Sequence, residues 1–281
     1  MEIGQFTHCY VDDSIHDALG FITLAFVFSP HDLDTSVRQA LAAAGLDPEC
    51  EEFKSRARMD QNPAMQAARD KLIGVIREHA HVGVVIARRH RIVPLGKQCL
   101  QALQSILIRN GIPPKDLRVH VDAEIFSSRE QAQAIHGVFQ FLAPMQLFPC
   151  EVSHTCRGIQ VADLVAHTLS QVVREGVTGA PKLIDVGGPD NGYAEGTMMP
   201  LSEFLLAGFR YRILARRMGY NGEQFDPATD PVIIGPDDDP ANYGQYPEAV
   251  GWGVQVAQET PDAVRHAVFK MLDRVWLGCM H

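Results

Sequence analysis

Several features of membrane-spanning, secreted and strongly basic proteins are missing from this sequence. The formal net charge is -9 at pH 7, which argues against a surface coated with basic residues for bulk nucleic-acid binding but leaves room for a local basic strip. The most apolar run, residues 20–28, is much shorter than the roughly 20 residues of a membrane helix. Residues 1–4 show no basic segment leading into an apolar one, so we expect no secretory signal and no membrane insertion.

The cysteines lack the regular spacing of a disulfide framework. The chain has 281 residues and 46% hydrophobic content, enough for a sizeable core without covalent staples. We therefore expect a globular cytoplasmic protein with reduced thiols. The six cysteines are Cys9, Cys50, Cys99, Cys150, Cys156 and Cys279.

Three further kinds of site lack their sequence signals. The glycine-rich residues 187–192 are not followed by Gly-Lys-Ser/Thr, so a loop is expected there and not a phosphate cradle. No Gly-x-Ser-x-Gly motif nominates a serine nucleophile. Cys150, His154 and Cys156 offer three zinc donors within seven residues, but a fourth ligand is missing, which favours buried thiols.

Hydrophobic periodicity predicts strands first and then helices and strands in alternation. Residues 6–11 and 20–28 read as two strands joined by a short polar link, with the strand pattern stopped by Asp-Asp-Ser at residues 12–14. We expect helices over 32–44, 63–79, 95–109, 129–142 and 157–173, and further strands over 81–87, 117–122 and 145–152. This order predicts an α/β fold, with a largely parallel sheet flanked by helices and an antiparallel hairpin.

The pattern weakens after Gly176, which divides the chain into an α/β domain over residues 1–178 and an α-rich extension over 179–281. We expect the extension to pack on the first domain, with helices over 201–218 and from 260 onward and a strand over 252–257. Residues 220–247 are rich in Gly, Pro, Asp and Asn, which is compatible with a lid, a disordered segment, or a contact for a second copy or a partner protein.

Four carboxylates are candidates for one site. Asp12 and Asp122 end predicted strands, Glu52 lies on a short charged segment, and Asp163 lies among aliphatic residues of a predicted helix. A buried carboxylate needs a partner or a metal. Convergence of the four would favour Mg²⁺, which prefers oxygen ligands. The alternative for Asp163 is a solvent-facing polar stripe with Gln160 and His167.

The sequence around these acids resembles the domain-of-unknown-function family 3800, a ribonuclease-H-like group. The motifs are Tyr10-Val11-Asp12-Asp13-Ser14, Glu52-Phe53-Lys54, Val121-Asp122, and the helical stretch from Gly158 to Ala166 containing Gln160-Val161-Ala162-Asp163-Leu164. The resemblance covers residues 10–173 and implies a ribonuclease-H-like mixed sheet with a metal-binding acidic cluster. Two departures are Asp13, where the family usually has Glu, and Ile15, where it usually has Gly.

The resemblance implies that Asp12 bridges two Mg²⁺ or Mn²⁺ ions whose shells Glu52, Asp122 and Asp163 complete, in a metal-dependent nuclease acting on nucleic acid. Two such ions activate a water and stabilise the leaving oxygen of a phosphodiester. The cations of Lys54, Arg88, Arg89 and Arg91 are candidates for backbone phosphate contacts, although a solvated surface cation is the plainer interpretation of each. The alternative function is a non-catalytic module of the same fold that binds a protein or a nucleic acid.

Overall fold

The computed structural model describes residues 6–90, 92–188, 193–214, 254–257 and 259–276. The strands are β1 (His8–His16), β2 (Phe21–Ser29), β3 (His81–Arg88), β4 (Arg118–Asp122), β5 (Gln146–Glu151), β6 (Leu183–Asp185), β7 (Met198–Pro200) and β8 (Val254–Val256). The α-helices are α1 (Asp34–Ala43), α2 (Pro63–His79), α3 (Leu95–Asn110), α4 (Arg129–His136), α5 (Gly158–Thr178), α6 (Leu201–Phe209) and α7 (Asp262–Trp276).

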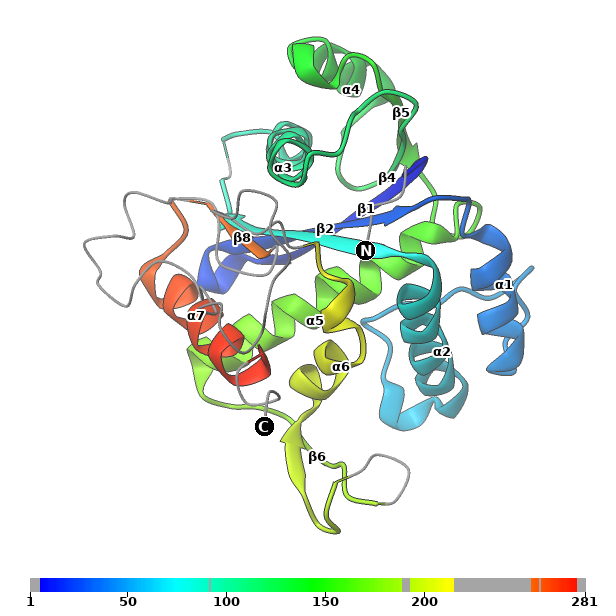
Figure 1. Ribbon diagram of the computed structural model, residues 1–281, viewed down its shortest axis with the longest axis vertical. Coiled ribbons are helices and arrows are strands. Elements are labelled where there is room, and N and C mark those ends of the chain that lie inside the picture. Colours follow the sequence, from blue (N-terminus) through cyan, green and yellow to red (C-terminus); the bar gives the residue numbers. More distant parts are fainter. Residues whose placement is uncertain (1–5, 91, 189–192, 215–253, 258, 277–281) are drawn as a thin grey trace, which may run out of the picture.

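Six strands form one mixed sheet in the order β5-β4-β1-β2-β3-β8 (Figure 1). The hairpin of β1 and β2 is antiparallel, as is the β2–β3 pair. The pairs β1–β4, β4–β5 and β3–β8 are parallel, and each has at least one helix between its strands along the chain, as a parallel crossover requires. The expected α/β class, a mixed sheet flanked by helices, is confirmed.

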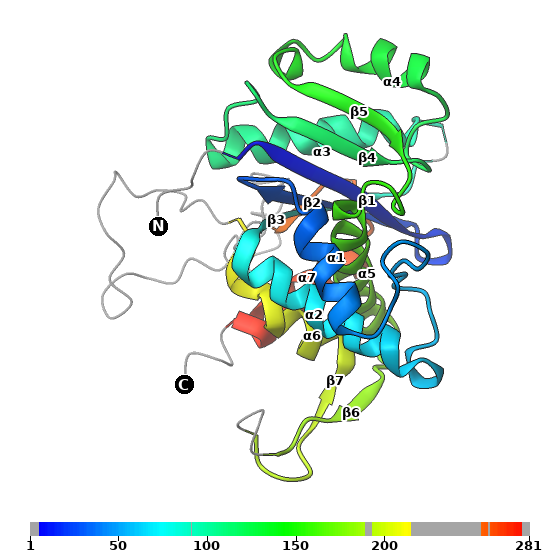
Figure 2. The same ribbon diagram turned by 90° about the vertical axis from the view of Figure 1, so that its right-hand side faces the viewer.

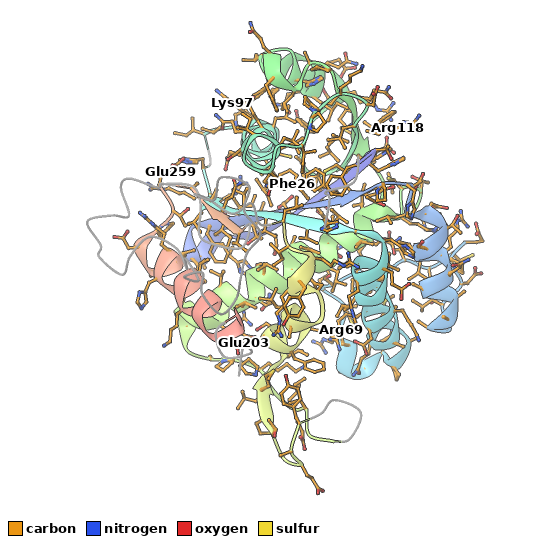
Figure 3. The ribbon with its side chains drawn as sticks, viewed as in Figure 1. Phe26, Arg69, Lys97, Arg118, Glu203 and Glu259 are labelled. Atoms are coloured by element: carbon orange, nitrogen blue, oxygen red, sulfur yellow. The ribbon has the colours of Figure 1, made fainter. Side chains whose placement is uncertain are left out.

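Helices cover both faces of the sheet and divide the core into two clusters. On one face, α3 packs against the side of β2 that carries Leu24 and Phe26 (Figure 3). On the other, α1, α2, α5, α6 and α7 enclose the side that carries Tyr10, Ala25 and Val84 (Figure 2). The alternation of side chains along each strand decides which helix layer a residue meets.

Strand β1 is longer than the sequence predicts. Asp12 and Asp13 do not end it, since they pair with Ala25 and Leu24 of β2 and the ladder continues to His16. The long apolar β2 supplies a full set of backbone partners, and this overrides the turn preference of the Asp-Asp-Ser stretch. The two adjacent aspartates therefore point to opposite faces of the sheet.

Several helices and strands differ in length from the expectation. The expected helix over 129–142 ends at His136 and is followed by a short 3-10 turn at Gln140–Leu142. The expected helix over 201–218 ends at Phe209, after which Ile213 forms a bridge with Val82 of β3. The hairpin of β6 and β7 was not anticipated. It extends away from the main sheet in Figure 2.

The extension is joined to the first domain through the sheet itself. β8 pairs with Val84 and Ile86 of β3, and α7 packs beside α5, where Ala267 lies against Gly176. Residues beyond 179 therefore contact elements that precede them in the chain. The boundary at residue 178 itself stays a prediction.

Some sequence predictions fall outside the described residues. These are the 220–247 segment, Cys279 and Arg91. The other five cysteines have free thiols, as expected. Among the described residues no helix combines the length and apolarity that crossing a membrane requires, and a cytoplasmic location stays a prediction.

Candidate metal centre

The start of α5 lies directly against β1. A Cβ atom on Gly158 would lie 2.3 Å from Cε1 of Tyr10, so the backbone approaches the tyrosine ring closely. The Tyr10 hydroxyl donates a hydrogen bond to Oδ1 of Asp32 at 2.9 Å and accepts one from the amide of Leu33 at 3.0 Å. The close approach of Gly158 to Tyr10 places the start of α5 against β1. Asp163, in the next turns of the helix, is then close enough to act on Asp12.

The polar stripe of α5 faces the protein and not the solvent. Gln160 is only 1% exposed, and its side chain accepts a hydrogen bond from the amide of Phe53 at 2.8 Å and donates one to the carbonyl of Ser153 at 2.8 Å. The solvent-facing stripe considered for Gln160, Asp163 and His167 is therefore wrong. Gln160 holds two irregular segments of the chain at the edge of the site.

Asp163 lies one helical turn after Gln160 and is partly buried. Its Oδ2 accepts a hydrogen bond from the backbone amide of Ser55 at 2.9 Å. Burial raises the pKa of the Asp163 carboxyl, whereas the Ser55 amide and the nearby Lys54 ammonium oppose this increase. The charge of Asp122 raises it further.

Three of the four predicted carboxylates lie near one another on this face. Tyr10 pairs with His120 and Val11 with Val121 in the parallel β1–β4 ladder, so the next residues, Asp12 and Asp122, are neighbours at its end. Burial raises the pKa of Asp12 well above its usual range, and the charges of Asp163 and Asp122 add to the increase. Burial likewise raises the pKa of Asp122.

Asp13 lies on the opposite face, toward α3. Burial, together with the charges of Asp122 and Glu124, raises the pKa of Asp13 to about 7, while Arg89 opposes the increase. From the sequence, Asp13 was assigned no role and was noted only as standing where the resembling family usually has Glu. A predicted strand that continued past residue 11 would have shown the difference, because side chains alternate between the two faces of a strand and Asp12 and Asp13 would then lie on opposite faces.

The fourth predicted carboxylate, Glu52, has partners other than the aspartates. Its Oε2 accepts a hydrogen bond from the Ser153 hydroxyl at 2.7 Å, and its Oε1 lies 3.3 Å from Nζ of Lys54. The Lys54 ammonium also donates to the Ser153 hydroxyl oxygen at 2.8 Å. Lys54 acts on Asp122 and Asp163 as well, so it is a counter-charge within the site.

A second group of metal-binding side chains adjoins the aspartates. His120, Glu151 and Cys156 have ligand atoms that all lie within 4.8 Å of one another. Within the described part of the chain this is the one set of three His, Cys, Asp or Glu residues that meets this limit, so the three aspartates are more widely spaced. The anticipated zinc donors Cys150 and His154 are not members.

The donor types of the two groups differ. Burial lowers the pKa of His120 to about 4, and the imidazole is neutral at pH 7. Burial and the charges of Glu151, Asp32 and Asp34 raise the pKa of the Cys156 thiol to about 12. The aspartates offer only oxygen, which suits Mg²⁺ or Mn²⁺, and their mutual repulsion would be relieved by a divalent cation.

Two of the predicted phosphate-binding cations line a surface hollow beyond the tip of the β1–β2 hairpin. Arg88 and Arg89 contribute to it together with His90, Asp17 and Glu259. Glu259 is labelled in Figure 3. Nε of Arg89 lies 3.7 Å from Oδ1 of Asp17, so part of its charge is already compensated.

No family model and no curated protein matches the chain. Among solved structures, a chain of the complex between PCNA and RNase HII from Archaeoglobus fulgidus aligns with a TM-score of 0.39 and 13% identity. The alignment covers 79% of this chain and 98% of that chain. A likeness of this size carries no conclusion about activity.

Proposed function

We propose that the chain is a divalent-metal-dependent phosphodiester hydrolase that acts on nucleic acid. The observation that carries this proposal is the approach of Asp12, Asp122 and Asp163 from two strands and a helix to one face of the sheet, where each pKa is raised by burial. Carboxylates placed together without enough counter-charge are costly, and metal-dependent chemistry is a common reason for such an arrangement. We also propose that the chain is a member of the domain-of-unknown-function family 3800, because the resemblance to that family rests on motifs that contain these carboxylates.

In this proposal Asp12, Asp122 and Asp163 hold Mg²⁺ or Mn²⁺, and Glu52 completes the shell from the side of the 52–55 segment. When bound, the ions supply an activated water and stabilise the leaving oxygen of the phosphodiester. The amide of Ser55 orients Asp163. Lys54 is close enough to Asp122 and Asp163 to attract the substrate phosphate at the edge of the site.

The alternative is a non-catalytic module of the same fold that binds a protein or a nucleic acid. One observation favours it: the Glu52 carboxylate is already engaged by Lys54 and Ser153. If that engagement persists in solution, the site lacks its fourth ligand. Binding without cleavage would then be the function.

A cleavage assay on the full chain separates the two functions. Purified protein is incubated with Mg²⁺ or Mn²⁺ and with single-stranded RNA and DNA, both duplexes and a hybrid. We expect cleavage of at least one substrate and a loss of at least about 100-fold in Asp12→Asn and Asp163→Asn, because even changes to partners of metal ligands cost 10- to 100-fold. Glu195→Gln, at an exposed carboxylate between β6 and β7, is the matched control.

Cleavage by Asp12→Asn and Asp163→Asn at the parent rate would rule out the assigned site. Cleavage by neither the parent nor any variant, with nucleic acid bound equally by all, would support the non-catalytic module. Circular dichroism of each variant shows whether the fold is retained.

A further inference from the structure

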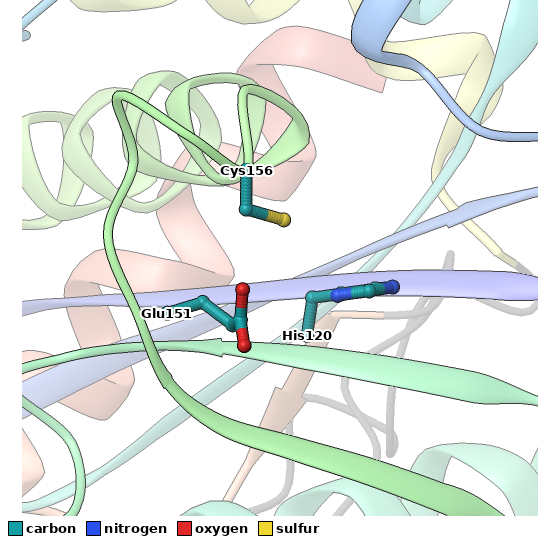
Figure 4. Close-up of side chains that lie close together, drawn as sticks. All are labelled: His120, Glu151 and Cys156. Atoms are coloured by element: carbon teal, nitrogen blue, oxygen red, sulfur yellow. The ribbon is translucent and has the colours of Figure 1, made fainter.

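Three side chains of different chemical types meet beside the aspartates. His120 extends from β4, Glu151 from the end of β5, and Cys156 from the turn that leads into α5 (Figure 4). Their nitrogen, oxygen and sulfur ligand atoms lie within 4.8 Å of one another. Nothing in the proposed hydrolysis uses His120 or Cys156.

An irregularity in β5 directs Glu151 toward this group. His120 pairs with Phe148, but Asp122 pairs with Glu151, so β5 contains one extra residue at this point. The extra residue displaces Glu151 onto the face that His120 occupies, since bulges redirect side chains. Cys150, within the bulge, has a φ of 60°, a conformation that costs a non-glycine residue about 1–2 kcal/mol.

His120 is oriented by its neighbours and has an unused nitrogen. Its ring stacks on Phe148 at 4.8 Å and on Tyr10 at 5.3 Å between centroids. Its Nδ1 is buried and makes no hydrogen bond with any residue that the structure describes. A buried polar atom without a protein partner is costly, and this nitrogen is therefore free to bind a ligand.

We propose that His120, Glu151 and Cys156 bind one zinc ion, with water in the fourth position. A mixed set of nitrogen, sulfur and oxygen donors is typical of zinc, whereas Mg²⁺ takes oxygen alone. Bonds of about 2.0 to 2.3 Å require the donors to approach one another by about 1 Å on binding, which rotation of the Glu151 and Cys156 side chains can provide. The Cys156 thiol loses its proton to solvent, as thiolate is the ligand form.

The ion would join β4, β5 and the start of α5. The connection between Glu151 and Cys156 also contains Ser153, which bonds to Glu52, Lys54 and Gln160. Zinc would therefore fix the segment that positions one side of the carboxylate group. The zinc site does not depend on the proposed hydrolase activity.

Cobalt substitution tests the zinc site. The full chain is freed of metal with a chelator and titrated with Co²⁺ under reducing conditions. We expect one Co²⁺ per chain with a thiolate-to-cobalt charge-transfer band, displaced by one equivalent of Zn²⁺ and not by excess Mg²⁺. Cys156→Ser should lose this band and at least about 100-fold in Zn²⁺ affinity, while the matched control Cys150→Ser keeps both.

Two further variants keep the test decisive. His120→Gln should weaken Zn²⁺ binding by a similar factor while the Cys156 thiol remains, which covers the case in which Cys156→Ser fails to fold. Asp163→Asn should keep the band, because Asp163 belongs to the carboxylate group. Any of three results would overturn the zinc proposal: a parent chain without the band, a Cys156→Ser chain that retains it, or loss of the band in a folded Asp163→Asn chain. None of these results bears on hydrolysis.

Discussion

Asp12 and Asp13 are consecutive residues with different environments. Asp12 faces Asp122 and Asp163 on the α5 side, and Asp13 faces α3, where the charge of Arg89 compensates part of its own. Both carboxyls have raised pKa values, mainly because of burial. The two carboxyls therefore respond to different neighbours, although they are adjacent in the chain.

Asp13→Asn should change how stability depends on pH. The pKa of Asp13 is about 7 in the folded chain and 3.8 in the reference state, so the folded state holds an extra proton between these values and loses stability as the pH rises through this window. Because about two units of this window lie above pH 5, we expect the variant to gain about 3 kcal/mol of stability relative to the parent between pH 5 and 8. Urea unfolding in metal-free buffer measures this difference.

The exposed Glu195→Gln substitution is the control for Asp13→Asn and should show a constant, small difference from the parent across the same pH range. A constant difference for Asp13→Asn as well would mean that the Asp13 carboxyl titrates normally in the folded chain.

Mg²⁺ should stabilise the parent chain at pH 8 but not Asp12→Asn. Binding to the folded state alone adds about 2.7 kcal/mol at a ligand concentration one hundred times Kd, and the neutral amide of Asn removes a ligand that faces Asp122 and Asp163. Thermal unfolding with and without Mg²⁺ measures the effect. Equal Tm increases in both proteins would place the stabilising ion elsewhere.

At the scale of elements, the contact between α5 and β1 positions the carboxylates. Gly158→Ala should destabilise the chain by about 1–3 kcal/mol, because the added methyl group would overlap the Tyr10 ring. Gly74→Ala in α2 is the matched control, since a Cβ there meets nothing within 4 Å, and it should stabilise by about 0.5–1 kcal/mol. Urea unfolding distinguishes them, and equal behaviour would contradict the close approach.

The sequence predicts most of the long elements because their apolar periodicity is strong. Helix α5 was expected over 157–173 and extends over Gly158–Thr178. The convergence of four acids, Asp12, Glu52, Asp122 and Asp163, was also expected. The structure brings Asp12, Asp122 and Asp163 to one face of the sheet, and the site formed by the four stays a prediction.

Other features depend on contacts between distant segments and could not be inferred. The bulge at Cys150 has no sequence signal, because cysteine is not a residue that favours a positive φ. A regular strand without the bulge would pair Asp122 with Cys150, so the pairing of Asp122 with Glu151 could not be predicted. The capture of Glu52 by Ser153 likewise joins residues that are about a hundred positions apart.

For the whole molecule, the C-terminal residues complete the core. Val254, Val256 and Val264 belong to the same hydrophobic cluster as Val84 and Leu169. A fragment of residues 1–178 should therefore lack cooperative unfolding, since it exposes the surface of α5 and β3 that these residues cover. Near-UV circular dichroism and urea unfolding measure this loss.

Adding a separately produced 179–281 fragment should restore part of the cooperativity, and this is the control for the truncation. Cooperative unfolding of the 1–178 fragment with the stability of the full chain would show that the first domain is independent.

The place of β8 in the sheet also affects how the chain folds during synthesis. More than half of the residues lie between Arg88 and Val256 in sequence, and at the usual rate of translation this interval takes on the order of ten seconds. Until then, among the described residues, the outer side of β3 is paired only at Val82, once Ile213 has been made, and unpaired strand edges attract other chains. Nascent copies on one messenger would then depend on chaperones until translation passes residue 256.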